Sequence, residues 1–195
     1  NVTWDAQLHY PANAFPSIVE WLVQTCEYFA TRSDLQLLIR VHPAEISGFP
    51  PSRQPILQEL RKRVPELASN IIVVPPESDI GTYALMSLCD AAIIYGTKMG
   101  VELTSIGIPV IVAGEAWIRN KGLTHDATTP EEYFAILERL PFPERLGPAQ
   151  LSRARRYAYH FFFNRMIPLP FIEPNAGFPV YRLELNRLQQ LLPGD

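Results

Sequence analysis

Apolar and polar positions follow two patterns along this chain, one typical of buried strands and the other of helices. Four short runs are almost wholly apolar, as expected for strands covered on both faces: residues 35–41, 71–74, 91–95 and 109–113. Apolar side chains elsewhere recur every three or four positions, which predicts helices over residues 15–31, 55–67, 79–88 and 98–106. This alternation of strands and helices predicts an α/β fold with a Rossmann-like, doubly wound parallel sheet.

Capping residues and prolines indicate where these elements begin and end. Asp79 is placed to cap the helix that ends at Leu88, and Thr129 is placed to cap a further helix over residues 130–140. A stretch rich in proline and glycine, residues 43–51, is predicted to be a loop.

The pattern changes from about residue 141. Three segments follow: a helix with arginines and aromatic residues over 148–163, a proline-rich extended segment over 168–179, and an amphipathic helix over 180–192. We therefore predict a Rossmann-like domain over residues 1–140 and a helical, proline-rich C-terminal extension over residues 141–195 that packs on it.

Composition indicates a globular protein and narrows its partners. Apolar residues make up 47% of the 195 residues and charged residues 19%, which excludes a disordered chain. The net charge of −3 gives no general basis for binding nucleic acid, even though arginines and aromatic residues alternate near residue 155. No apolar stretch approaches the roughly 20 residues that span a bilayer. The chain begins with Asn1, which reads as the exit from a preceding strand and predicts a fragment of a longer protein.

Cysteine usage and motif searches exclude several chemistries. Cys26 and Cys89 lie far apart in apolar segments, so we expect buried, reduced thiols and neither a disulfide nor a metal site. No Walker loop, Gly-x-Ser-x-Gly elbow or His-Glu-x-x-His motif is present.

The first candidate site residue is His42, at the end of an apolar run. Proline at position 43 disfavours helical geometry at His42, so the chain turns where the strand ends. Ligands of open α/β sheets bind at that edge, where an imidazole can donate to a phosphate and stabilise a leaving phosphate. The alternative is a histidine that only bonds a neighbouring loop.

The second candidate is the stretch that runs from Tyr95 to Glu102. Gly96 and Gly100 would let the backbone approach a ligand, Thr97 supplies a hydroxyl donor, and Glu102 suits a ribose diol. A strand-to-helix turn with a solvated glutamate is the alternative.

Two further loops are expected at the same edge. The loop that follows residue 113 offers Glu115, Arg119, Lys121 and His125, with a solvated loop around an inward Trp117 as the alternative. Asp5 would lie in the loop after the strand expected before Asn1.

Several of these segments resemble a known family. Residues 1–6, 40–43, 96–116 and 121–124, together with 156–163, are similar to bacterial capsule polysaccharide biosynthesis proteins, which are GT-B glycosyltransferases related to capsular Kdo transferases. The resemblance implies that this chain is the Rossmann-like C-terminal half that binds the nucleotide-sugar donor. His42 and Thr97 would then contact donor phosphate, and Glu102 would hold the ribose or base.

The resemblance also sets expectations for substrate, partners and location. The donor is expected to be a nucleotide-sugar, with a CMP-sugar as first choice, bound as substrate without a separate cofactor or metal. A glycan or glycolipid acceptor would be held by a missing N-terminal half, so this half would be inactive alone. We expect a cytoplasmic protein, peripheral to the inner face of the membrane, that associates with export machinery. Two other functions stay open: a sugar-nucleotide epimerase domain, and a non-catalytic interaction module of a polysaccharide assembly or export system.

Overall fold

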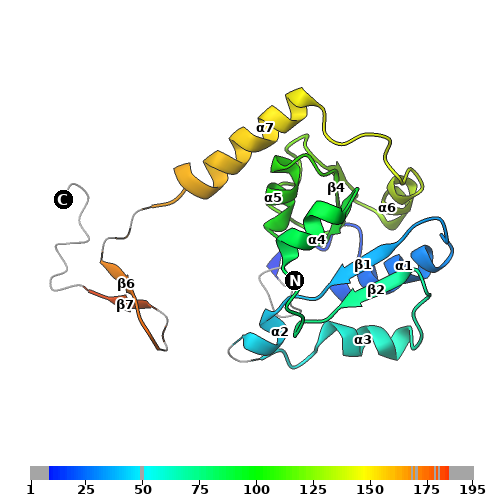
Figure 1. Cartoon of the computed structure of the whole chain (residues 1–195), viewed down its shortest axis with the longest axis horizontal. Helices are drawn as coiled ribbons and strands as arrows, with labels where there is room; N and C mark the ends of the chain where they lie inside the picture. Colours follow the sequence, from blue (N-terminus) through cyan, green and yellow to red (C-terminus); the bar gives the residue numbers. More distant parts are fainter. Residues whose placement is uncertain are drawn as a thin grey trace. The chain divides into compact units, whose positions relative to one another are not determined.

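The computed structural model describes residues 9–48, 51–167, 169, 171–177, 179 and 181–184 (Figure 1). The chain divides into two compact units, residues 1–158 and residues 159–195. This division after residue 158 does not test the domain boundary predicted after residue 140, which stays a prediction.

Helices and short strands alternate through the first unit. Its elements are α1 (Ile18–Ala30), β1 (Leu37–Arg40), α2 (Ala44–Ser47), α3 (Ile56–Arg63), β2 (Ile71–Val74), α4 (Thr82–Leu88), β3 (Ala92–Ile94), α5 (Met99–Ser105), β4 (Val110–Val112), β5 (His125–Asp126), α6 (Pro130–Leu137) and α7 (Pro148–Tyr159), which runs one residue into the second unit. The four predicted strands are all present. The loop predicted over residues 43–51 instead contains the short helix α2, and strand β5 was not anticipated.

All strand pairs of the first unit are parallel, which confirms the α/β class. β1 pairs with β2 from Leu37 opposite Ile71 to Arg40 opposite Val74. β4 lies between β3 and β5 in a second sheet. The described strands of the first unit thus form two small parallel sheets in place of the one doubly wound sheet that was predicted.

One of the two predicted helix caps is present in the structure, and the other is not. The Thr129 hydroxyl accepts a hydrogen bond from the Glu132 amide, as predicted for the start of α6. The predicted cap at Asp79 is wrong, because α4 begins at Thr82 after Gly81, and no side chain caps it. Ser17 caps α1 by accepting from the Glu20 amide.

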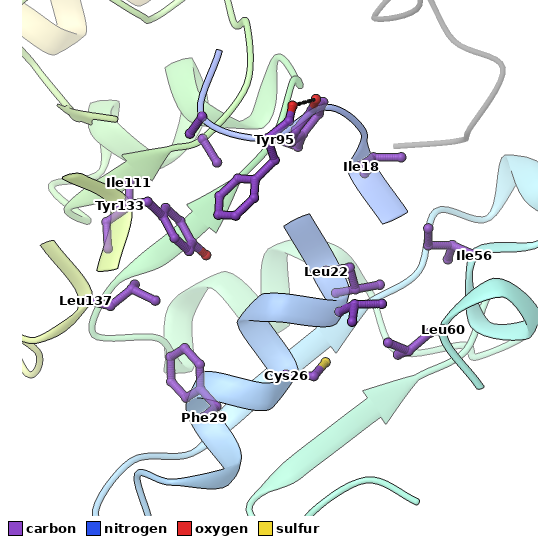
Figure 2. Close-up of a cluster of buried hydrophobic side chains, with 14 of the residues drawn as sticks. Ile18, Leu22, Cys26, Phe29, Ile56, Leu60, Tyr95, Ile111, Tyr133 and Leu137 are labelled. Carbon is purple, nitrogen blue, oxygen red and sulfur yellow. Dashed lines mark hydrogen bonds between the residues drawn. The ribbon is translucent and has the colours of Figure 1, made fainter. Parts of the chain in front are cut away.

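Helix α1 forms the centre of the hydrophobic core. Figure 2 shows Ile111, Tyr133 and Leu137 to one side of this helix and Ile56 and Leu60 to the other. The first three residues belong to β4 and α6, and the other two belong to α3. Helix α1 packs between these two groups and joins them into one core.

A buried polar network stiffens one side of α1. Trp21 Nε1 donates to the Tyr133 hydroxyl at 3.1 Å, and that hydroxyl lies 2.8 Å from Thr25 Oγ1. Thr25 Oγ1 also donates to the Trp21 carbonyl at 2.6 Å. Since this uses the single hydroxyl hydrogen of Thr25, Tyr133 donates to Thr25, and each polar atom has a partner.

The two cysteines are free thiols, as predicted. Cys26 is buried on α1, and loss of solvation raises the pKa of its thiol to about 12. Cys89 is only half-buried, and its thiol donates to the Leu85 carbonyl. The prediction of full burial therefore holds for Cys26 alone.

The second unit contains a π-helix and a hairpin. The π-helix is His160–Asn164, and strands β6 (Ile172–Pro174) and β7 (Tyr181–Leu183) pair antiparallel. A helix had been expected over residues 180–192. Residues 181–183 form a strand instead, because their backbone pairs with residues 172–174; residues 185–192 lie outside the described part.

Candidate functional site

The predicted site residues lie where parallel strands end. His42 follows β1, Gly96 and Thr97 follow β3, and Glu115 follows the neighbouring strand β4. Asp5 lies outside the described residues. The structure therefore places the β3 and β4 residues on adjacent strand ends, and His42 at the end of a strand in the other sheet.

His42 is exposed, and the loop holds its ring in one orientation. The Ala44 amide donates to its Nδ1 at 3.0 Å. An acceptor at Nδ1 requires a lone pair there, so the neutral ring carries its hydrogen on Nε2. The bond from Ala44 thus fixes both the tautomer and the orientation of the ring at the end of β1.

Arg40 ties together the loops that follow β1 and β2. Its guanidinium donates to the Pro75 carbonyl at 2.6 Å and to the Val41 carbonyl at 2.9 Å. A longer bond, 3.4 Å, reaches the Ser78 carbonyl. The sequence stretch at residues 40–43 thus contains a positioning arginine immediately before the candidate histidine, a role that the sequence alone does not reveal.

Glu45 holds the chain that follows His42. Its side chain is buried in α2, and Oε1 accepts from the Ile56 amide at 2.9 Å, at the start of α3. The Glu45 carbonyl accepts from Ser52. Loss of solvation raises the pKa of this carboxyl group, while the bond from Ile56 lowers it.

Replacing Glu45 by alanine should lower the free energy of unfolding by about 1–2 kcal/mol, because the Ile56 amide loses its acceptor.

Glu45→Gln keeps an acceptor oxygen and removes the buried charge. The folded-state pKa is raised above 4.5, so ionisation opposes folding as pH rises through that range. Chemical denaturation from pH 4 upward should therefore show the glutamine variant gaining on the wild type as pH rises. An opposite trend would contradict the burial argument.

Thr97 starts the turn from β3 into α5. Its hydroxyl oxygen accepts from the Met99 amide at 3.3 Å, so the side chain is held over the first turn of the helix. The hydroxyl hydrogen is still available to donate. Thr97 therefore combines a local structural contact with a donor for a ligand.

Gly100 is required for packing. A Cβ atom at this position would lie 2.7 Å from Ile94 Cδ1 and 2.8 Å from Ile118 Cγ2. The missing side chain lets α5 lie close to β3 and to the loop after β4. Gly100 is buried, so in the structure its close approach is to these two isoleucines.

Glu102 is held by a tyrosine that sequence reasoning missed. The Tyr83 hydroxyl, from α4, donates to Glu102 Oε2 at 2.7 Å, and this bond together with the carboxylate charge raises the pKa of Tyr83. Oε1 of Glu102 accepts no hydrogen bond from the described residues. Tyr83 is 70% exposed, so its ring is accessible beside the half-buried Glu102. An isolated tyrosine on a short helix gives no sequence signal for this role.

Contacts across the chain fix the end of β4. Asn13, which has a φ of 53°, donates through Nδ2 to Glu115 Oε2 at 3.0 Å. Gly114 lies against Tyr95, where a Cβ would meet the Tyr95 carbonyl oxygen at 2.6 Å. The Tyr95 hydroxyl in turn donates to the Phe15 carbonyl at 2.9 Å. The segment before α1 therefore forms one side of this strand edge.

Arg119 supports the loop after β4 from within. Its side chain is 6% exposed, and its guanidinium donates to backbone or hydroxyl oxygens of Val112, Gly114, Ala127 and Thr128. The expectation that Arg119 lines the site is wrong, because the side chain is buried and these oxygens accept from both of its terminal nitrogens.

Three other residues between β4 and the end of β5 have different surroundings. His125 stacks on Phe142 at 4.6 Å, and burial together with the Arg139 charge lowers its pKa. Lys121 is exposed, and its carbonyl accepts from Arg153. Trp117, which the alternative interpretation placed inward, is 46% exposed.

A hollow of about 410 Å³ lies at α1 and α6, lined by Glu20, Gln24, Glu27, Tyr28 and Phe134. It is formed by helix surfaces and does not involve the strand ends. Over the described ranges, no three His, Cys, Asp or Glu side chains gather as metal ligands would. None of the helices described is long and apolar enough to cross a membrane.

Comparison with protein families decides the assignment. The family model described as "Capsule polysaccharide biosynthesis protein" matches residues 1–146 of the 195. The chain belongs to this capsule polysaccharide biosynthesis family. Neither a comparison with curated proteins nor one with solved structures finds a match.

Membership of the capsule polysaccharide biosynthesis family supports a role in capsule synthesis. The match includes all predicted site residues, from Asp5 to Glu115, as well as Tyr83 and Arg119. It ends before α7 and the second unit. The candidate site is thus part of the matched region, while the arginine-rich helix lies beyond it.

Proposed function

We propose that the first unit is the donor-binding domain of a capsule glycosyltransferase, with a Rossmann-like architecture of the GT-B type. The parallel strands with polar side chains at their carboxyl ends support this assignment, because α/β sheets bind nucleotides there. The observation that carries the proposal is the pairing of Tyr83 with Glu102. It fixes one carboxylate oxygen and leaves the other for a ribose hydroxyl.

Each residue of the site has a distinct role in this proposal. His42 donates through Nε2–H to a phosphate oxygen of the donor, and the Thr97 hydroxyl donates to the same group. Oε1 of Glu102 accepts from the ribose, with the Tyr83 ring beside the base. Glu115, held by Asn13, accepts from a sugar hydroxyl. A CMP-sugar is the preferred donor because of the resemblance to Kdo transferases.

Transfer in this proposal is a direct displacement. The acceptor hydroxyl oxygen forms a bond to the anomeric carbon while the bond from that carbon to the phosphate oxygen breaks. The bonding electrons leave with the nucleotide, whose charge His42 and Thr97 stabilise. The acceptor proton passes to a base that we assign to an acceptor-binding half. The donor half alone is therefore expected to bind nucleotide without transferring sugar.

Isothermal titration calorimetry with CMP, CDP and UDP tests the proposal. Cytidine nucleotides should bind the wild type, and His42→Ala should weaken binding by roughly ten-fold or more, as expected for a lost bond to a charged group. Tyr83→Phe frees Glu102 and should weaken binding by roughly three- to ten-fold. His160→Ala changes a histidine of the π-helix and serves as the matched control. Equal affinities of the wild type and His42→Ala, or no binding of any nucleotide, would overturn the assignment.

A further inference from the structure

A long stretch of the chain around α7 lacks acidic residues. Between Glu144 and Glu173 there are no aspartates, glutamates or lysines, and there are five arginines: Arg145, Arg153, Arg155, Arg156 and Arg165. With His160 neutral, the stretch carries a charge of +5, in a chain whose net charge is −3. Positive charge is therefore concentrated in this segment, although the net charge of the whole chain is negative.

Among the residues that the structure describes, no carboxylate pairs with the arginines of α7. Arg153 donates to the Lys121 carbonyl at 3.0 Å, and Arg155 donates to the Ser105 carbonyl at 3.2 Å. Arg156 is exposed, and the ion pairs of the described residues lie elsewhere. Carbonyl oxygens orient the guanidinium groups of Arg153 and Arg155 without neutralising their charge. They are free to act on an external anionic surface.

The residues that follow present apolar side chains to solvent. Exposed fractions are 60% for Tyr159, 65% for Phe163, 68% for Met166 and 79% for Ile167. Tyr159 and Phe163 lie against one another, with ring centroids 5.3 Å apart. Apolar side chains this exposed, in a stretch without acidic residues, are typical of segments that lie at a membrane interface.

We propose that residues 153–167 bind the surface of a bilayer that contains anionic lipid. The arginines contact lipid phosphates, and the side chains of Phe163, Met166 and Ile167 enter the boundary between headgroups and acyl chains. A nucleic acid would also attract the arginines, but its bases stack on aromatic rings, whereas the exposed aliphatic side chains of Met166 and Ile167 suit acyl chains. Binding of this kind would hold a capsule-synthesis protein at a membrane surface without a spanning helix.

Vesicle co-sedimentation of the whole chain tests this proposal. The wild type should bind vesicles of phosphatidylcholine mixed with phosphatidylglycerol and should bind pure phosphatidylcholine weakly. Each arginine near an anionic surface contributes roughly five-fold, so the double variant Arg155→Glu/Arg156→Glu should lose roughly 25-fold or more. Phe163→Ser/Ile167→Ser leaves the charge unchanged and should also weaken binding. Added salt should weaken the wild type.

A matched control separates a local surface from general charge. Arg61→Glu/Lys62→Glu makes the same change of charge on α3 and should leave vesicle binding unaltered. Thermal unfolding of every variant checks that the fold is retained. The proposal is overturned if the α3 variant loses as much binding as the α7 variant, if pure phosphatidylcholine binds equally well, or if an RNA oligonucleotide binds more tightly than the mixed vesicles. Since no nucleotide enters this assay, the result is independent of donor binding.

Discussion

Replacing Phe15 by alanine should lower the free energy of unfolding by about 3–5 kcal/mol. The ring is 1% exposed and meets Tyr133 and Phe134 edge-on, with centroids 5.1 Å and 6.2 Å away. Its backbone carbonyl also accepts from Tyr95, so the surrounding chain is held in place and cannot collapse into the cavity. Urea denaturation followed by circular dichroism measures the loss.

Phe163→Ala is the matched control for this substitution. It removes the same side chain from a position that is 65% exposed, and its effect should stay within about 0.5 kcal/mol. Equal losses for the two variants would contradict the placement of Phe15 at the centre of the core.

Replacing Arg119 by methionine should cost about 2–4 kcal/mol, because the Gly114 and Ala127 carbonyls lose charge-assisted hydrogen bonds inside the protein. Methionine keeps the length and apolar stem of the side chain, so lost hydrogen bonds account for most of the change. Since Gly114 precedes Glu115, the substitution should also weaken nucleotide binding. Denaturation and calorimetry on one preparation measure both effects.

Two further variants show whether the guanidinium fork matters. Arg119→Lys retains the charge, yet a single ammonium cannot reach all four oxygens, so we expect an intermediate loss. Arg156→Met removes an exposed arginine and should be neutral within about 0.5 kcal/mol. A methionine variant as stable as the wild type would contradict the supporting role of Arg119.

Local pattern was sufficient for most elements of the first unit. Residues 71–74 form a strand over the predicted range, because four consecutive apolar side chains fit a strand and no competing periodicity is present. The cap at Thr129 was equally predictable, because a threonine before a proline and two glutamates satisfies the helix start locally.

Features that depend on distant partners were not predictable. The helix expected from residue 180 is a strand over 181–183, because pairing with residues 172–174 overrides the helical spacing. The two-residue strand β5 exists only through its pairing with β4.

The candidate site divides in the same way. Strand ends and a proline predicted His42, Thr97 and Glu102 as candidate site residues, since each follows a recognisable apolar run or turn. Tyr83 was missed because its contact with Glu102 spans 19 positions of the chain. Arg119 was expected to line the site, with a solvated loop as the alternative, because charged loop residues are usually exposed; here backbone carbonyls replace the water around it.

The short segment before α1 offers a way to measure ligand binding by hydrogen exchange. Its Ala14 amide donates to the Ala113 carbonyl at 3.1 Å, directly beside Gly114 and Glu115. An amide hydrogen that is held this way exchanges with deuterium only when the strand edge opens. The deuterium exchange rate of the Ala14 amide therefore reports on whether the strand edge is occupied. Ala14 lies one residue from Asn13, which holds Glu115.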